Sequence, residues 1–356
     1  MEIKVWWYLK TLYCLHDTDQ KFQMRVFPNG MGMLFILGIS FCMAWIDPSA
    51  VVSFDPLSTD LLSKFVIFGN FFLQGWKLSP PRLYEVWSDG FALCMTQIAI
   101  LAIPIALVLG SWVFGLIDHE KLSPFLLLAC LPTTVSSCVV YTERAGGDSN
   151  YALGQASISN FLAPLFVPLA WFFLINPVQN LDLVNGEISS LTVIFVNLMM
   201  MVILPCFLGY KSNKFFRWGP GTFVGWILNQ LPFLGIAILA YFALCEALLE
   251  NGRDLCLREA IELSAPLTIG FFILGCISWV LSGWIRSDLS GRLAVFFCLS
   301  QKSLAMGIPM VHLLAGNSLQ TFVWIFPILL FHFIQLFFGA IMIPLFKIGR
   351  TQKFVD

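Results

Sequence analysis

The stretch FFCLSQKSLAMGIP, which runs from Phe296 to Pro309, decides the fold. It has the apolar character of a membrane helix, yet four polar residues stand in succession at positions 300–303. A lysine at the centre of a membrane helix costs about 2.5–3.5 kcal/mol on insertion scales, so Lys302 must face protein or a water-filled cavity. Gly307 and Pro309 follow closely, and a proline removes a backbone donor from its helix. The stretch therefore predicts an interrupted membrane helix with a functional lysine.

The composition of the whole chain also indicates a membrane protein. Of its 356 residues, 58% are hydrophobic and 12% are charged, whereas soluble domains carry about 25% charged residues. The formal net charge of −1 gives no reason to expect nucleic acid as a partner. The sequence has no phosphate-binding loop, no zinc-protease motif and no dinucleotide fingerprint. We therefore expect no enzyme, no cofactor and no resident metal, and the bilayer is the partner that this composition implies.

Ten segments are apolar enough to cross a bilayer, which takes about 20 residues each. They lie at about 30–46, 61–75, 91–115, 121–144, 150–175, 189–210, 223–245, 264–284, 291–314 and 318–346. If the N-terminus is placed inside, most of the 20 Lys and Arg residues fall in inside segments, as the positive-inside rule requires. We expect an all-α multi-pass protein of the cell (inner) membrane with both termini cytoplasmic, and the oligomeric state stays open.

The polar interruptions divide the ten spans into two halves. The stretch CLPTTVSSC (130–138) interrupts the fourth span, and CLSQKSLAM (298–306) interrupts the ninth, which is the fourth of the second half. Five spans per half give the halves opposite orientations, which is the logic of an inverted repeat. Discontinuous helices at matching positions are the best sequence indication of a transporter's binding site.

The same pattern predicts how the chain is organised. Residues 1–29 form an N-terminal interfacial segment, 30–209 hold the first repeat and the sixth span, and 210–222 form a basic cytoplasmic linker. Residues 223–347 hold the rest of the second repeat, and 348–356 form a cytoplasmic tail. Cys245 and Cys256 flank one loop and could pair in an oxidising compartment, which their spacing alone does not decide.

The candidate site gathers the polar residues of these spans. Lys302 has two plausible roles: it binds an anionic solute directly, or its ammonium takes the place of a coupling cation. The other candidates are Gln301, Ser303, Thr133, Thr134, Ser136, Ser137, Gln97, Ser157 and Asn70. Because burial favours the neutral form of a lysine, proton coupling is also open. His312 and His332 show no metal-ligand spacing, and we assign them to packing or a polar network.

Three stretches carry a resemblance to a known family. FFLQGWKLSP (71–80), ACLPTTVSSCVVYT (129–142) and FFCLSQKSLAMGIPM (296–310) resemble the bile acid:sodium symporter family, in the branch typified by the seventh member of solute carrier family ten. The resemblance implies two inverted five-helix repeats, with a core domain around the crossing of spans four and nine. It further implies a panel domain of spans one, two, six and seven, and alternating access by movement between the two domains.

The sequence departs from that family where sodium would bind. Sodium-coupled members use hydroxyls and amides of span four, polar groups of span five and an acidic residue of span nine. With Gln301 as the match to the family's glutamine, the acidic position falls on Phe297 and the following amide becomes Lys302. The Ser-Asn pair of span four appears as Ser137-Cys138. We therefore expect neither sodium coupling nor bile acids.

These expectations define a leading function and its alternatives. The leading one is a secondary active transporter of a small organic anion, which resembles the bile acid:sodium symporters but has degenerate sodium sites. One alternative is a membrane regulator of calcium or ion homeostasis, and the other is a proton or cation antiporter on the same scaffold.

Overall fold

A computed structural model of the chain describes residues 29–51, 56–77, 89–175, 196, 199–213, 223–315 and 321–352. Every regular element in these residues is helical. In chain order they are α2 (Asn29–Ile46), the 3₁₀ helix η1 (Pro48–Val51), α3 (Pro56–Lys77), α5 (Gly90–Val113), α6 (His119–Cys130), α7 (Val135–Ala145), α8 (Ser149–Ala170), the π-helical turns η2 (Trp171–Ile175) and η4 (Met199–Ile203), α10 (Leu204–Ser212), α11 (Phe223–Ile285), α12 (Leu289–Ser300), α13 (Leu304–Ala315) and α14 (Thr321–Gln352). Residues 1–28 of the predicted N-terminal segment, 214–222 of the basic linker and 353–356 of the tail lie outside the described residues.

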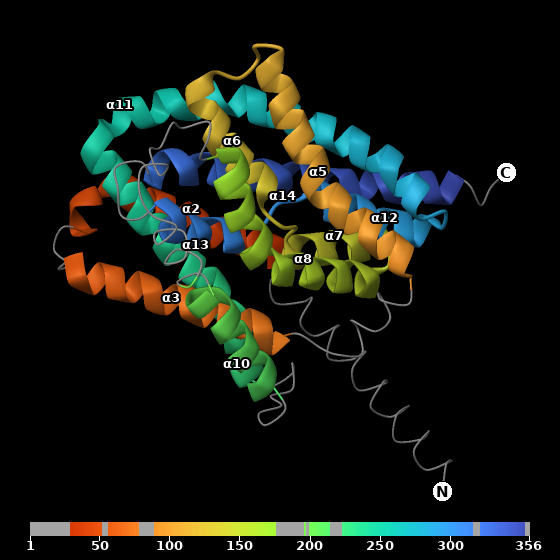
Figure 1. Cartoon of the computed structure of the whole chain (residues 1–356), viewed down its shortest axis with the longest axis horizontal. Coiled ribbons are helices and arrows are strands. Elements are labelled where there is room, and N and C mark those ends of the chain that lie inside the picture. The colour runs from red at the N-terminus through yellow and green to blue at the C-terminus, as the bar shows by residue number, and fades with distance from the viewer. Residues whose placement is uncertain are drawn as a thin grey trace, which may run out of the picture.

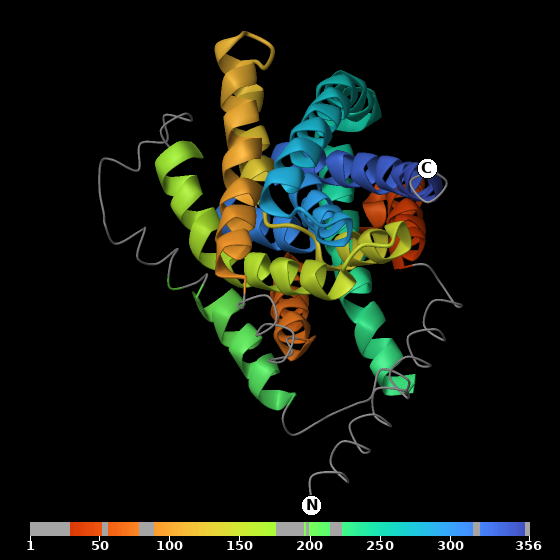
Figure 2. The same ribbon diagram turned by 90° about the vertical axis from the view of Figure 1, so that its right-hand side faces the viewer.

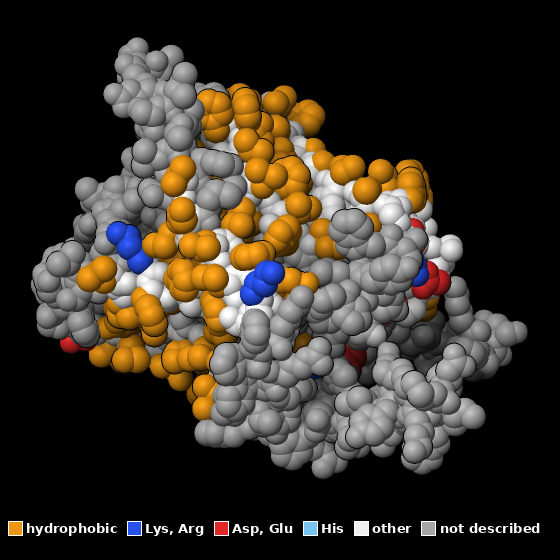
Figure 3. Space-filling model, turned by 60° about the horizontal axis from the view of Figure 1, so that its bottom comes forward, with side chains coloured by type: hydrophobic (Ala, Val, Ile, Leu, Met, Phe, Trp, Pro, Cys, Tyr) orange, Lys and Arg blue, Asp and Glu red, His pale blue; other side chains and the backbone are white. Residues whose placement is uncertain are grey.

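Five helices of the described residues are long and apolar enough to cross a membrane, or six if α6 and α7 are taken as one bent span. Exposed apolar side chains cover a broad face of the molecule (Figure 3), as expected where lipid replaces water. The expectation of an all-helical membrane protein is confirmed. Ten spans in an inverted repeat stay a prediction, because residues 176–195 lie outside the described part of the chain.

Both predicted interruptions are present. The first separates α6 from α7, which meet at a bend of 63°. Pro132 stands in this break, and Thr134 caps α7 by accepting a hydrogen bond from the Ser137 N–H. The second break separates α12 from α13 at 301–303. In both places the polar run ends one short helix and lets another begin, as the sequence indicates.

The α12–α13 unit lies at the centre of the molecule. In its most apolar window 94% of the residues are buried, whereas the corresponding value for α5 is 22%. Helices α5, α7, α8, α11 and α14 all pack against α12 or α13, and Figure 2 shows the blue segments near the C-terminal end of the chain in the middle of the molecule. The polar residues of the second break are therefore shielded from lipid on all sides.

The structure corrects the boundary predicted between the seventh and eighth spans. The hydropathy pattern predicts a loop between 245 and 264, whereas the structure is helical on both sides of Gly252 and confines the break to a kink at this residue. The segment is rich in Ala, Leu, Glu and Arg, which are good helix formers, so the helix extends well beyond the apolar stretch. Gly252 has φ of +76°, which glycine adopts without strain, and α11 changes direction there (Figure 1).

A second group of helices forms around α3. Figure 1 shows α3 crossing α10 apart from the helices that surround α12. Their backbones touch: a Cβ atom on Gly75 would overlap the carbonyl of Cys206, and one on Gly209 would overlap the carbonyl of Phe72. Small residues allow such close approach between membrane helices. Helices α2 and α3 also pack on α11, so α2, α3, α10 and α11 form one packed group.

Candidate functional site

The two breaks touch each other directly. The Ser303 N–H donates a hydrogen bond of 2.8 Å to the carbonyl oxygen of Pro132. The Ser137 hydroxyl donates a short hydrogen bond to Oε1 of Gln301. Inside a membrane, backbone groups released by a broken helix must find partners within the protein. Here part of each break is satisfied by the other, so the two interruptions form one site.

The ammonium of Lys302 lies at this crossing and is bound by backbone oxygens. Its Nζ donates to the carbonyls of Ile100, Ala129 and Leu131 at 2.7, 2.7 and 2.8 Å. Ala129 and Leu131 belong to the end of α6, where helix carbonyls lack partners, and a cation is favoured at such an end. The side chain is 3% exposed. All three ammonium protons are used, so none is left for a solute in this conformation.

The buried lysine has no acidic counterpart in the described residues. Their buried polar side chains are hydroxyls, amides, one histidine and Lys302, without an aspartate or glutamate. Phe297, for which the resemblance predicts an acidic residue in sodium-coupled members, is 1% exposed, and its ring centroid lies 5.9 Å from that of Tyr141. Within the described part of the chain, main-chain carbonyl dipoles therefore balance the ammonium at the crossing.

Helix α8 completes the first break. Nδ2 of Asn160 donates to the Thr133 carbonyl at 2.7 Å, and the Ser159 hydroxyl accepts from the Thr133 N–H at 3.3 Å. The Thr133 hydroxyl itself is buried without a hydrogen-bond partner in the described structure. Asn160 and Ser159 of α8 therefore bond to the first break. The sequence predicts Ser157 as the site residue of this helix, and Ser157 lies nearby.

The remaining candidates lie at different distances from the crossing. The hydroxyls of Thr134 and Ser136 are 3.4 Å apart in the first turn of α7. Gln97 pairs with the side chain and carbonyl of Gln155 on α8, one turn before Ile100 on α5. Ser157 bonds back to the Leu153 carbonyl of its own helix. The crossing thus gathers Lys302, Gln301, Ser303, Thr133, Thr134, Ser136 and Ser137, while Gln97 and Ser157 bond elsewhere.

Asn70 is the candidate that reaches the crossing from the α3 group. Its Nδ2 donates to the Ala305 carbonyl in the first turn of α13 at 3.4 Å. Its Oδ1 is buried and has no partner in the described structure. Asn70 therefore offers a free acceptor where the α3 group faces a broken helix.

Sequence reasoning missed Gln335 of α14, which is fully buried. Its Oε1 accepts from the Lys302 N–H at 2.7 Å, and its Nε2 donates to the Lys302 carbonyl at 2.8 Å. The available signal was an amide with His332 three residues earlier in an otherwise apolar helix. Cys245, a candidate for a disulfide, is a buried free thiol, and the side chain of Cys256 lies outside the described residues.

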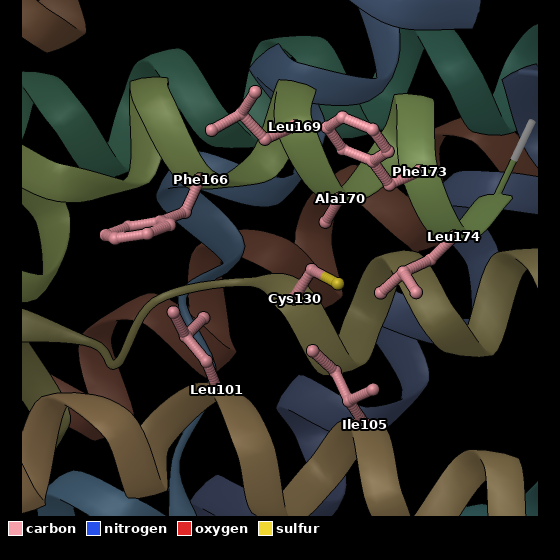
Figure 4. Close-up of a pocket in the computed structure, with 8 residues that line it drawn as sticks. All are labelled: Leu101, Ile105, Cys130, Phe166, Leu169, Ala170, Phe173 and Leu174. Atoms are coloured by element: carbon pink, nitrogen blue, oxygen red, sulfur yellow. The ribbon is translucent and has the colours of Figure 1, made fainter.

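An apolar groove adjoins the site between α5 and α8. Figure 4 shows the Cys130 thiol among the side chains that line it, which are Leu101, Ile105, Phe166, Leu169, Ala170, Phe173 and Leu174. Cys130 stands between the two α6 residues whose carbonyls bind Lys302. None of the described side chains that line the groove is charged.

A helical membrane protein with two interrupted helices whose polar breaks meet has the construction of a membrane transporter. The comparison with known proteins agrees: the chain belongs to the SBF-like CPA transporter family, whose model matches residues 32–348. It is 24% identical to sodium/bile acid cotransporter 7 of Mus musculus, over 93% of this chain and 97% of that protein. It is 25% identical to sodium/bile acid cotransporter 7-A of Xenopus laevis, over 88% and 91% of the two chains. The putative symporter YfeH of Escherichia coli is 26% identical over 90% and 96%.

Proposed function

We propose that the protein is a secondary active transporter that moves a small organic anion by alternating access, with the Lys302 ammonium in the place of a coupling cation. The observation that carries this proposal is the set of three carbonyl oxygens around Nζ, at 2.7–2.8 Å. The resemblance implies that sodium-coupled members bind cations near this crossing. In this chain a cation that is covalently part of α12–α13 joins the two broken helices.

The local chemistry disfavours sodium at this position. Backbone carbonyls are typical ligands of a bound alkali cation, and here the ammonium already occupies them. A second cation beside Lys302 would meet a like charge in a medium of low dielectric constant. The carboxylate that would attract it is replaced by the packed Phe297. The names of the relatives from Mus musculus and Xenopus laevis mention sodium and bile acid, but the residues of this crossing favour neither.

The charge of the site supports an anionic solute. Lys302 is buried without an acidic partner in the described residues, so a bound anion would supply the missing negative charge. Helices α7 and α13 both begin at the crossing, and the positive ends of their dipoles lie there. Half-helices that end at the midplane serve anionic substrates in other transporters by the same physics. A small organic acid with a hydrogen-bond donor would also suit the free Oδ1 of Asn70.

The packing supports a division into two moving parts. Helices α2, α3 and α10 and the part of α11 before Gly252 would form the panel, and the remaining helices would form the core with the crossing. Asn70 contributes a polar contact from the panel to the core, at 3.4 Å, which a relative movement could break cheaply. On this proposal the chain has ten spans in two inverted repeats, lies in the cell membrane and has both termini in the cytoplasm.

Uptake by reconstituted vesicles tests the proposal. Purified protein in liposomes is offered a panel of labelled organic acids, matched neutral compounds and cations, with and without imposed ion gradients. We expect saturable uptake of at least one organic acid, lost in Lys302→Met and retained in Lys64→Met, which changes an exposed lysine of α3. Absence of uptake across the panel, together with altered calcium flux in cells that carry the protein, would instead favour a regulatory role.

A further inference from the structure

Gln335 engages both backbone groups of the residue at the second break. Its Oε1 accepts from the Lys302 N–H at 2.7 Å, and its Nε2 donates to the Lys302 carbonyl at 2.8 Å. This is the pairing that a neighbouring strand would provide, supplied here by one side chain of an intact helix. Lys302 lies between α12 and α13 and is excluded from either helical ladder, so the amide replaces the bonds that the interruption removes.

The second proton of the amide fixes the state of His332. Nε2 of Gln335 lies 2.7 Å from Nδ1 of His332. The two bonds to Lys302 orient the amide so that its nitrogen faces Nδ1. An amide nitrogen donates and does not accept, so this geometry makes Nδ1 the acceptor and puts the ring proton on Nε2. The ring is 2% exposed, and its Nε2 has no partner in the described structure. A neutral ring with this tautomer therefore holds the amide in the one orientation that suits Lys302.

We propose that Gln335 is a positioning residue for Lys302, oriented by His332, and that this pair fixes the ammonium among its three carbonyls. The inference rests on the proposed function, in which the fixed ammonium replaces a coupling cation. A lysine has a flexible four-carbon stem and freely rotating donors. Its head group can act as a site-bound ion only if its backbone is held in place, and the amide holds that backbone on both sides.

The crossing has other contacts that do not depend on the side chain of Gln335. The Ser303–Pro132 backbone bond and the Ser137–Gln301 bond do not involve α14. The Tyr141 hydroxyl, which donates to the Leu336 carbonyl at 2.8 Å, still ties α14 to α7. Replacing Gln335 by methionine keeps the length of the side chain and removes both hydrogen bonds to Lys302. The change therefore loosens the lysine without removing the helix that supports it.

Chemical protection of Lys302 measures this positioning without any transport assay. The reconstituted protein is treated with formaldehyde and a borohydride reagent, and methylation of the Lys302 peptide is followed by mass spectrometry. We expect protection in the native protein and modification about tenfold faster or more in Gln335→Met, the factor that corresponds to losing hydrogen bonds of ordinary strength. Leu336→Ala is the matched control, because it perturbs the same helix at a buried site of the apolar cluster around Phe297 and leaves both Gln335 hydrogen bonds to Lys302 in place. Protection in Gln335→Met equal to that in the control would overturn the inference.

A measurement on the native protein covers the case in which Gln335→Met does not fold. The nitrogen chemical shifts of ¹⁵N-labelled histidine, assigned with His332→Phe, report which ring nitrogen carries the proton. An unprotonated Nδ1 on His332 supports the inference, and a protonated Nδ1 contradicts it. If protection and tautomer are as expected but no solute is transported, the positioning stands and the proposed function fails. If transport depends on Lys302 but neither readout responds, the function stands and the positioning fails.

Discussion

The backbone N–H of Ser303 donates to the carbonyl oxygen of Pro132, and the side-chain Nζ of the neighbouring Lys302 donates to the carbonyl oxygen of Leu131. The two interrupted helices are thus joined main chain to main chain. The ammonium of Lys302 also donates to the carbonyls of Ala129 and Leu131, the two neighbours of Cys130 at the end of α6. This relationship explains why the polar runs can exist inside a membrane: each break supplies partners to the other. It also places the side-chain nitrogen of Lys302 at the junction.

A positive side chain of different shape should not substitute for Lys302 in transport. Lys302→Arg keeps a positive side chain, but the guanidinium is planar and larger, and its N–H groups cannot converge on three carbonyls around one point. We expect uptake by Lys302→Arg to fall at least about tenfold, close to the loss in Lys302→Met, with protein still recovered in the membrane. Initial uptake rates at equal protein density provide the measurement. A native rate in the arginine variant would show that the fixed geometry is irrelevant.

The Ser137–Gln301 contact should contribute to stability as part of the crossing. Ser137→Ala leaves the buried Oε1 of Gln301 without this donor, which costs about 1–3 kcal/mol. Ser282→Ala removes a hydroxyl that bonds only to the Trp279 carbonyl of its own helix, so a much smaller effect is expected. Thermal unfolding in detergent, followed by a thiol-reactive dye, compares the two variants. Equal shifts in Tm would mean that the crossing bond adds nothing.

Gly75→Ala should weaken the packing of α3 on α10. The added methyl would overlap the Cys206 carbonyl, and backbone cannot move aside as a flexible side chain can. Overpacking of this kind costs about 1–3 kcal/mol and sometimes more. Gly69→Ala on the same helix meets nothing within 4 Å and should stabilise α3 slightly, because alanine is the better helix former. A Gly75→Ala protein as stable as Gly69→Ala would refute the close approach.

The ion pairs at the start of α12 should make stability depend on acidity. Burial alone would raise the pKa of Asp288, but the hydrogen bond from the Gly291 N–H and the pairing with Arg286 leave the pKa below its ordinary value. Stabilisation by this carboxylate is therefore complete above the unfolded pKa of about 3.9 and is lost as pH falls through the lower folded value. Asp288→Asn should lower Tm near neutral pH and converge with the native protein in acid. A constant difference across the acid range would argue against the linkage.

The local parts of this structure could be predicted from the sequence, and the remote partners could not. Pro132 and the polar run at 300–303 act on their own helices, so both breaks were found where the structure has them. The loop predicted between 245 and 264 was too long, with the break confined to Gly252, because hydropathy reports where a span ends and not where a helix ends. The three oxygens around Lys302 are backbone carbonyls, which every residue has, so the sequence does not indicate which of them bind the lysine. Gln335 has no local pattern that indicates its partner, so only the fold reveals it.

Uptake measured with and without a sodium gradient tests most directly whether Lys302 takes the place of a coupling cation. Liposomes that contain the native protein are given an inward sodium gradient or an equal gradient of choline, with a transported organic acid outside and the membrane potential clamped. Because Lys302 already occupies the carbonyls at the crossing, we predict the same initial rate in both. A strict requirement for sodium would contradict the account, since it would place a mobile cation at a junction that the lysine is proposed to fill.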